Sequence, residues 1–529
     1  MKNRKSTKRA LLGSIMAMVL CLAMLVGATF AWFTDTASTG VNKIQAGKLD
    51  VALEMKEGDS WVSAEGKTLN WVKAAAGEQV LWEPGCTYTL PELRVVNNGN
   101  LALKYKIQIT GIQGDAKLNE VIDWTINDAA IDLTEGHLTA GQQGDAFTIK
   151  GHMKETAGND YQNLTIDGIG ITVYATQDTV EYDSFNNTYD ANAQYPAMPY
   201  VTSHEALNTN LTLADIPTNE ATGKHDPVEV ALGNTEAGDI AYSEHSSGYT
   251  GKGVMLGSTK LNSYAAAPAK AGEYTFVFKN GTINSAATGY SSIDNLKDTS
   301  VYMLVPGNSD VVFENMTFNG VVSFDIQMYT SPWSYLHSIT FKNCTFNGIV
   351  VGSCPAEKAT FDGCTFNNYT NTAYANNSNP IWWRAGTGYW GTGADESVHS
   401  LREFTFVNNT VTSTRPVKIE RIGWNCTAGI TILDNTFDIS KQAGDSETKN
   451  MAINIGQRDN TSKFILTDDG NTISAGTASL YTAALGSGSN QYVAVSGSKV
   501  LDRNGNDKVI TAMVWKTTTG ETFEMKTID

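Results

Sequence analysis

The sequence has few cysteines, and they do not form a metal or redox motif. The six are Cys21, Cys86, Cys344, Cys354, Cys364 and Cys426. No Cys-x-x-Cys pair occurs, which argues against a zinc ribbon and against a thioredoxin-like site. After the N-terminal leader five cysteines remain, an odd number without the spacing of a disulfide framework.

Basic residues and histidines are also scarce. The 38 lysines and arginines are outnumbered by 55 acidic residues, which gives a formal net charge of −17. Nucleic acids and anionic lipids are bound through basic patches, so neither is an expected partner. The seven histidines are scattered between His137 and His399, and no His-Glu-x-x-His motif is present. The sequence therefore predicts no metal site and no cofactor.

Charged residues make up 18% of the 529 residues, whereas glycine, asparagine and threonine are plentiful. Such a composition is typical of β-rich extracellular proteins rather than helical bundles. The length is sufficient for two or three domains with cores of their own.

Residues 1–31 have the pattern of a signal peptide. A basic stretch precedes a nearly continuous apolar run from Ala10 to Phe30, and Thr29 and Ala31 are small residues at the −3 and −1 positions. We therefore predict cleavage between Ala31 and Trp32. The apolar run of about 20 residues is also long enough to span a bilayer, so an uncleaved membrane anchor is the alternative.

Residues 32–180 show alternating apolar segments that predict an antiparallel β-sandwich. Residues 49–55 place Leu, Val, Leu and Met on one face, and residues 164–177 have the same period. Residues 93–110 predict two strands around the turn Asn97-Asn98-Gly99-Asn100.

Several stretches of this region, taken together, resemble the TasA/camelysin (CotN) family of biofilm-matrix proteins. They are GATFAWFTDTAS, NKIQAGKLDVAL, WEPGCTYTLPELRVVNNGNLALKYKIQI and AGNDYQNLTIDGIGITVYATQ, in this order. The resemblance covers about residues 10–190 and implies a jelly-roll-like sandwich. It also implies processing by a signal peptidase of the SipW type and export to the surface or matrix of a Gram-positive-type bacterium.

The resemblance further implies assembly by donor-strand exchange with further copies or related fibre subunits. The segment freed by cleavage would add to an open sheet edge of the next subunit, where its backbone groups are satisfied. Such head-to-tail contacts give fibres because they do not close. The predicted donor segment runs from Trp32 to about Lys48, with anchors Trp32, Phe33, Val41 and Ile44. The alternative is that this segment pairs within its own domain.

Residues 181–201 are polar and proline-containing and are interpreted as a linker. Thr202 and Glu205 form a capping-box pattern, which predicts a short helix that caps the following domain. A strand-turn signature then recurs as FKNGTINS, FENMTFNG, FKNCTFNG, FDGCTFNN, FVNNTVTS, LDNTFDIS and DDGNTISA. Its threonines are Thr282, Thr317, Thr345, Thr365, Thr410, Thr436 and Thr472. Their spacing, from 20 to 45 residues, fits coils of a β-solenoid with loop insertions or a skipped coil.

Each repeat has the pattern of one corner of a coil. An apolar residue points inward, an Asn or Gly two residues later takes a bend, and a small and an aromatic residue then point inward again. Cys344 and Cys364 are expected to stack as buried residues on adjacent coils, with a disulfide as the alternative, and Cys354 lies in a loop between them. The signature resembles the right-handed parallel β-helix (pectin-lyase-like) superfamily over residues 202–500. Residues 501–529 are interpreted as a C-terminal cap or strands.

No catalytic residues are predicted. A lyase of this superfamily needs clustered acidic calcium ligands and a base, and a hydrolase needs paired aspartates. The acids of this region are instead scattered, and they include Asp325, Asp362, Asp395, Glu396, Glu403, Asp434 and Asp438. Glu420 lies among Arg415, Lys418 and Arg421 and is interpreted as part of a self-paired strand face. The sequence DRNGNDK (502–508) only faintly resembles a calcium loop and is interpreted as a turn.

Residues 368–393 are the most distinctive insertion, because aromatic residues crowd there. The candidate carbohydrate-contact residues are Trp382, Trp383, Arg384, Tyr389 and Trp390, together with Trp424. Aromatic rings with nearby hydrogen-bonding groups suit sugar rings, and an arginine suits an acidic sugar. The alternatives are that the rings pack over the flank of the solenoid as a satellite core or contact a protein.

The sequence as a whole predicts an all-β secreted protein with a structural or adhesive role at the cell surface or in the extracellular matrix, and with polysaccharide as a candidate partner. The rival hypothesis is a surface-tethered polysaccharide lyase or glycoside hydrolase, and a third is an envelope or spore protein without a ligand. Two or three carboxylates within about 10 Å, facing a groove, would favour the enzyme.

Overall fold

The computed structural model describes residues 48–67, 69–72, 81–114, 116–131, 135–162, 164, 166–179, 193, 195–196, 198–219, 222–236, 238–241, 250–258, 260–261, 269–290, 300–326, 335–352, 356–384, 401–422, 427–439, 451–457, 463–474, 477, 479–485, 499–508, 513–516 and 522–524. The predicted cleavage site at Ala31 and Trp32 and the donor anchors Phe33, Val41 and Ile44 lie outside these residues.

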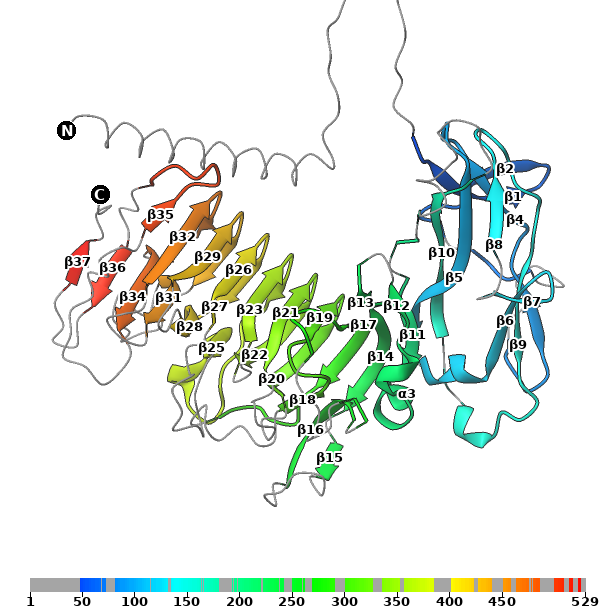
Figure 1. The fold of residues 1–529 in the computed structure, drawn as a ribbon. Helices are drawn as coiled ribbons and strands as arrows, with labels where there is room; N and C mark the ends of the chain where they lie inside the picture. The colour runs from blue at the N-terminus through cyan, green and yellow to red at the C-terminus, as the bar shows by residue number, and fades with distance from the viewer. Residues whose placement is uncertain are drawn as a thin grey trace, which may run out of the picture. The chain divides into compact units, whose positions relative to one another are not determined.

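Antiparallel sheets make up the N-terminal part of the described chain, as its alternating pattern predicts (Figure 1). Their strand orders are β2-β1-β4, β10-β5-β8 and β3-β9-β6-β7. The strands are β1 (Val51–Glu57), β2 (Ser60–Ser63), β3 (Thr87–Thr89), β4 (Leu93–Asn97), β5 (Leu103–Gly114), β6 (Ile122–Ile126), β7 (Ala129–Ala130), β8 (Glu135–Leu138), β9 (Ile149–Met153) and β10 (Ile166–Gln177). The 3-10 helices η2 (Ala116–Val121) and η4 (Asn159–Tyr161) lie between them in sequence.

One apolar core joins these sheets. Leu93 and Val95 of β4, Leu103 of β5 and Ile149 of β9 have no exposed surface, and they share a cluster with Ile126 of β6. Strands of separate sheets that bury their apolar faces against each other form a sandwich. The all-β antiparallel domain is therefore confirmed for the described residues, while the jelly-roll order of its strands stays a prediction.

The turn around Gly99 does not connect a hairpin. β4 pairs with β1, whereas β5 pairs with β10 and β8, so the two predicted strands belong to different sheets. Asn97 is fully buried, and its amide donates to the carbonyl oxygens of Leu101 at 2.8 Å and Thr139 at 3.1 Å. These bonds tie the turn to the segment after β8, so the chain crosses between sheets instead of folding back on β4.

Beyond residue 199 the strands form a solenoid. Strands β11 and β14 to β37 join into one sheet of 25 strands, with parallel pairing from coil to coil, while β12 and β13 form a separate two-stranded sheet (Figure 1). Antiparallel pairs occur where β15 (Gly238–Ala241) meets β16 and where β37 (Thr522–Glu524) meets β36. A predominantly parallel stack of this length is the architecture of a parallel β-helix, which confirms the predicted fold class.

The pairing divides the solenoid into three columns of stacked strands. The first column is β11 (Tyr200–Ser203), β14 (Val228–Glu236), β17 (Thr275–Asn284), β19 (Asp310–Glu314), β21 (Leu336–Lys342), β23 (Ala356–Asp362), β26 (Glu403–Val407), β29 (Thr427–Leu433), β32 (Lys463–Asp469) and β35 (Lys499–Leu501). The second column continues from β14 and β17 into β20 (Thr317–Ile326), β22 (Thr345–Gly352), β24 (Thr365–Phe366), β27 (Thr410–Ser413), β30 (Thr436–Ile439) and β33 (Thr472–Ile473). The third column is β16 (Thr250–Gly257), β18 (Ser300–Leu304), the ends of β20 and β22, β25 (Ile381–Arg384), β28 (Val417–Ile422), β31 (Met451–Gln457), β34 (Ser479–Leu485) and β36 (Met513–Lys516).

The repeat threonines stack in register on successive coils of the second column. Each one pairs with the next along the predicted series, from Thr282 with Thr317 to Thr436 with Thr472. Every predicted interval is therefore one coil, and the longer intervals contain insertions rather than skipped coils.

The bend that precedes each threonine has the backbone conformation that its residue type predicts. The residue two positions before the threonine has positive φ at Asn280, Asn315, Asn343, Gly363, Asn408, Asp434 and Gly470. Asparagine, aspartate and glycine tolerate this left-handed conformation best. The repeat signature thus reports a bend between the first and the second column.

Aromatic rings fill the interior on both sides of this bend. Phe341 stacks on Phe313 and Phe361 with centroid distances of 5.3 and 4.7 Å, and Phe346 stacks on Phe318 and Phe366 at 5.0 and 4.7 Å. Parallel register places identical side chains one coil apart, close to the strand spacing of about 4.8 Å. Because each ring is covered by the phenylalanine at the same position on the adjacent coils, the apolar core is continuous along the solenoid axis.

Cys344 and Cys364 are buried free thiols on adjacent coils, as expected, and they form no disulfide. Their Sγ atoms donate to the carbonyl oxygens of Phe313 and Phe341 at 3.3 and 3.4 Å. Burial raises the pKa of the Cys364 thiol far above its ordinary value, so this thiol is an inert core residue. Cys354 lies outside the described residues.

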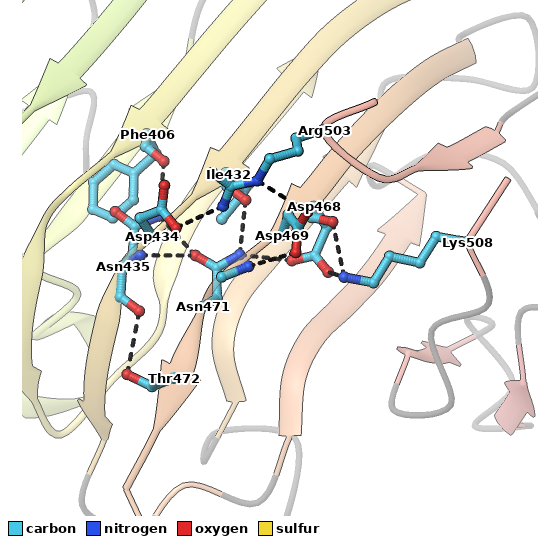
Figure 2. Close-up of polar contacts among 11 residues, drawn as sticks. Phe406, Ile432, Asp434, Asn435, Asp468, Asp469, Asn471, Thr472, Arg503 and Lys508 are labelled. Carbon is cyan, nitrogen blue, oxygen red and sulfur yellow. Dashed lines mark hydrogen bonds and ion pairs between the residues drawn. The ribbon is translucent and has the colours of Figure 1, made fainter. Parts of the chain in front are cut away.

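Asparagine side chains form two ladders along the solenoid. An inner ladder joins the buried Asn409 and Asn435 and the half-buried Asn471, and each side-chain oxygen accepts the backbone N–H of the residue one coil before. Figure 2 shows the step from Asn435 to Asn471. An outer, more exposed ladder joins Asn284, Asn319, Asn347 and Asn367 through single amide bonds of 2.6 to 2.9 Å. The asparagines of the inner ladder occupy the position, just before the repeat threonine, that Cys344 and Cys364 occupy on earlier coils. At this position the later coils are therefore joined by side-chain hydrogen bonds instead of apolar contacts.

The predicted cap helix is present as α3 (His204–Thr209), one residue out of register with its predicted cap. Ser203, rather than Thr202, is the N-cap, and its hydroxyl accepts from the N–H of Ala206 at 3.0 Å. Leu207 of this helix has no exposed surface and belongs to the solenoid core. Further short elements are η6 (Leu213–Asp215), β12 (Thr218–Asn219), β13 (Lys224–His225) and η9 (Ala375–Asn377).

Candidate functional site

Strand β25 carries the first three candidate carbohydrate-contact residues. It pairs with β22 on one side and with β28 on the other, in the third column. Successive side chains of a strand point to opposite faces, so Ile381 and Trp383 face the interior while Trp382 faces outward. This alternation separates the two tryptophans that the sequence places side by side.

Trp383 is a core residue. It has no exposed surface, and its ring meets Phe341 and Phe361 edge to face at centroid distances of 6.2 and 5.7 Å. The ring fits because its neighbour in register is Gly352, where a Cβ would collide with the indole. Trp383 is therefore not available to a sugar in this structure, and its indole N–H is buried without a hydrogen-bond partner.

Trp382 packs on the outside of the third column. Lys418, its neighbour in register on β28, places its Nζ 3.8 Å from the Trp382 ring centroid, and the ring of Tyr290 lies 6.1 Å away. The half-buried Trp382 belongs to a small cluster with Tyr290, Val321, Ile349 and Val351. Packing against this cluster is the satellite-core alternative that the sequence leaves open.

The segment 367–379 builds the rest of this cluster by folding back on residues 285–290. Asn371 is buried at its centre, where its side-chain oxygen accepts the N–H groups of Tyr290 and Ala373 and its amide donates to the Tyr290 carbonyl oxygen. The Tyr290 hydroxyl in turn donates to the carbonyl oxygen of Asn377 at 3.1 Å. One buried side chain thus fixes both segments over the solenoid flank.

The remaining candidate residues add little to the described surface. The backbone of Arg384 pairs in register with Glu420, and Tyr389, Trp390 and Trp424 lie outside the described residues. Of the candidate residues whose side chains the structure describes, Trp382 and Trp383 lie on opposite faces of β25 and do not form one exposed platform.

The acids that the sequence singles out are engaged by neighbours within the solenoid. Asp362 accepts from the amide of Asn408, Glu403 pairs with Lys358, and Asp438 accepts from the Ser474 hydroxyl. Asp325, Asp395 and Glu396 have no described side chain. Each of these three described acids has its own partner, and none of these contacts joins two carboxylates.

A stronger carboxylate cluster, missed by the sequence reasoning, lies at the C-terminal end of the solenoid. Asp434 and Asp469, on adjacent coils, both bind the guanidinium of Arg503 (Figure 2). The hydrogen bond from Arg503 is the main cause that lowers the pKa of Asp469 below its ordinary value. Arg503 thus favours the charged form of Asp469, whereas acid–base catalysis by paired aspartates needs one of the two to carry a proton.

The N-terminal region identifies the family. Residues 6–58 match the family model of the camelysin metallo-endopeptidase. This segment contains residues 6–31 of the predicted leader, the predicted donor segment and all of β1.

Residues 6–58 are thus similar to the camelysin/TasA family. Proteins of this family are secreted. The match confirms, for this segment, the resemblance that the sequence motifs predict. The family model leaves residues 59–529 unmatched, which include most of the antiparallel sheets and the whole solenoid. No curated protein and no solved structure matches the chain.

The camelysin description names a metallo-endopeptidase, which implies a metal ion. The matched segment 6–58 contains no histidine, although neutral histidine is a usual zinc ligand. Within the described parts of the chain, no three His, Cys, Asp or Glu side chains are grouped so that they could hold a metal ion. The residues present do not fit a protease zinc site, so no peptidase chemistry is assigned to them.

Within the described residues of this camelysin-type chain, no helix is both long and apolar enough to cross a membrane. The predicted leader and its alternative role as an anchor fall outside those residues.

Proposed function

We propose that the chain is a secreted, structural subunit of a cell-surface or matrix fibre, which assembles by donor-strand exchange and displays the solenoid. The observation that carries this proposal is the open edge of β10. Within the described residues β10 pairs only with β5, although it is 12 residues long. Its apolar residues Ile171, Val173 and Ala175 are only partly buried against the sandwich core.

A long edge strand with half-covered apolar residues suits an incoming strand. Its unpaired N–H and C=O groups offer a ladder of hydrogen bonds, and side chains at alternate positions of the incoming strand can complete the core. Natural sandwiches usually protect such edges with charges or proline, yet residues 166–177 contain one charged residue and no proline.

The donor segment is bounded by the place where the chain joins its own sandwich. The N–H groups of Asn98 and Asn100 donate to the carbonyl oxygens of Asp50 and Lys48 at 2.7 and 2.9 Å. A Cβ at Gly99 would collide with the Lys48 carbonyl oxygen, so only glycine permits this close approach. Residues 48–50 thus extend β1 along its own domain, and the segment proposed to leave it is residues 32–47.

We expect the double variant Val41→Asp/Ile44→Asp to stop fibre growth, because a carboxylate at each proposed anchor would have to be buried without a partner. Secreted protein is to be purified, its N-terminus sequenced, and its assembly followed by electron microscopy. Sequencing should find Trp32 first, as the predicted cleavage between Ala31 and Trp32 requires. The matched control is Ser38→Asp/Thr39→Asp, which adds the same charge at positions not proposed as anchors and should leave fibres intact.

A peptide of residues 32–47 provides an independent test. Added in excess, it should occupy the acceptor edge and shorten wild-type fibres, whereas the same peptide with the two aspartates should not. Wild-type protein that stays monomeric when concentrated and seeded would overturn the fibre proposal, and so would unchanged fibres in the Val41→Asp/Ile44→Asp variant.

A further inference from the structure

The hairpin formed by residues 499–508 closes the first column and the inner asparagine ladder. Its β35 pairs with β32 over Ile465, Leu466 and Thr467, and Val500 enters the solenoid core with 3% exposure. Beyond this strand pairing the hairpin is attached mainly by charges (Figure 2).

The first attachment is Arg503. Its Nη2 donates to Asp434 at 2.7 Å and its Nε donates to Asp469 at 3.0 Å, so one guanidinium bridges two coils. Gly470 lies between them, and a Cβ there would collide with the Asp434 carboxylate. These side chains are between 34% and 45% exposed, so salt can screen them.

The second attachment is Lys508. Its Nζ donates to the Asp468 carboxylate and to the Asp468 carbonyl oxygen, both at 2.8 Å. The Asp468 side chain is only 6% exposed, and its other oxygen accepts from the amide of Asn471, the last member of the inner ladder. Lys508 therefore neutralises a buried carboxylate that also orients the ladder, and salt should screen this pair much less than the pairs of Arg503.

The turn of the hairpin is built to present both cations. The Asp502 carboxylate accepts the N–H groups of Asn504 and Asn506 at 2.9 and 2.8 Å, and the Asn506 amide donates to its second oxygen. This confirms the sequence interpretation of DRNGNDK as a turn. Because the turn holds its own shape, Arg503 and Lys508 reach the adjacent carboxylates from one preformed unit.

We propose that residues 499–508 are an ionic strap: they close the end of the solenoid, and they open as a local unit without unfolding the coils before β29. An opened strap uncovers the backbone edge of β32 and the Asp468–Asn471 end of the ladder. Exposed strand edges pair with other chains, so the closed strap keeps this end from associating with a second copy. This proposal goes beyond fibre assembly and does not depend on it.

The acid sensitivity of the strap follows from the groups that face it. These are Arg503 and Lys508 on the strap itself, Asp434 and Asp469 at the bends, Asp468 beneath, and Asp502 in the turn. Hydrogen bonds lower the pKa values of Asp469 and Asp502 below the ordinary 3.8. A carboxyl group with a depressed folded pKa stabilises the closed strap above its unfolded pKa and loses that effect as the pH falls through the folded pKa. The strap should therefore stay closed at neutral pH and lose this stabilisation only as the pH falls below 3.8, through the lowered pKa values of Asp469 and Asp502.

Hydrogen–deuterium exchange of the full secreted chain tests the strap. In Arg503→Met, and more so in Arg503→Met/Lys508→Met, peptides from 463–474 and 499–508 should exchange at least about tenfold faster, while peptides from 310–366 stay unchanged. Wild-type protein at 1 M salt should show a smaller change of the same pattern. The matched control is Lys358→Met, which removes one exposed ion pair between coils in the middle of the solenoid and should leave the C-terminal peptides unchanged.

Sedimentation velocity then tests the protective role. The double variant should associate as concentration rises, at concentrations where the wild type and Lys358→Met do not; all of them carry the same N-terminal segment. Unchanged exchange at 463–474 and 499–508 would overturn the strap, as would acceleration spread evenly over the solenoid. Local opening without any added association would overturn the role at the strand edge.

Discussion

Replacing Asn435 with alanine is expected to be among the most destabilising single changes in the solenoid. The Asn435 side chain is fully buried and makes four hydrogen bonds. It accepts from the N–H and the amide of Asn409, and it donates to the Phe406 carbonyl oxygen and to the Asn471 side-chain oxygen. Each buried polar group left without a partner costs about 1–3 kcal/mol, less than additively. We expect the free energy of unfolding of the solenoid to fall by roughly 3–6 kcal/mol.

The outer ladder offers a matched control for the same chemistry. In Asn347→Ala the chain also loses one donated and one accepted amide bond, to Asn319 at 2.9 Å and from Asn367 at 2.6 Å. Asn347 is exposed, so water replaces those partners and the loss should stay within about 1 kcal/mol. Urea unfolding of both variants measures the difference. Equal losses would show that the inner ladder does not act through buried hydrogen bonds.

The threonine series could be predicted from the sequence because each coil repeats one local requirement. A residue that tolerates positive φ must stand two positions before each threonine, and Asn280, Asn315 and Asn343 meet that need with the same letter. The inner ladder left a signal too, in the triplets NNT, DNT and GNT, but a single asparagine beside a bend has several explanations. Only the register of the coils makes Asn409, Asn435 and Asn471 a stack.

Other features depend on contacts between distant parts of the chain, which no local pattern reports. Arg503 binds Asp434 across 69 positions and Asp469 across 34, and nothing near either acid predicts it. The sequence around Gly99 has the pattern of a hairpin turn. In the structure β4 pairs with β1 and β5 pairs with β10, and these distant partners are not visible in the local sequence.

The two tryptophans could have been separated by the sequence alone. In Ile-Trp-Trp-Arg, a strand of period two places the first tryptophan and the arginine on one face and the second tryptophan on the other. The prediction of one aromatic cluster over residues 368–393 did not take this alternation into account. The glycine that makes room for Trp383, Gly352, lies 31 positions earlier and carries no such signal.

Trp383→Ala should lower the free energy of unfolding by about 3–5 kcal/mol, because it empties a packed site lined by phenylalanines. Trp383→Phe keeps most of that volume and removes an indole N–H that is buried without a partner, so its cost should stay within about 1.5 kcal/mol. Trp382→Ala loses the contact with Lys418 and part of the satellite cluster, which predicts about 1–2 kcal/mol. Thermal or urea unfolding of the three variants gives this order.

The same three variants separate packing from carbohydrate contact at β25. If the aromatic insertion binds a sugar, Trp382→Ala can weaken binding on a glycan array while the protein stays folded at its cost of about 1–2 kcal/mol. Trp383→Phe cannot weaken binding in this way, since a residue with no exposed surface offers no stacking face. Loss of glycan binding in Trp383→Phe with full stability would contradict the core assignment. The core assignment would also be contradicted if Trp383→Ala lost only little stability and bound glycans as well as the wild type. A cavity of that size in a packed aromatic core should lower the free energy of unfolding clearly.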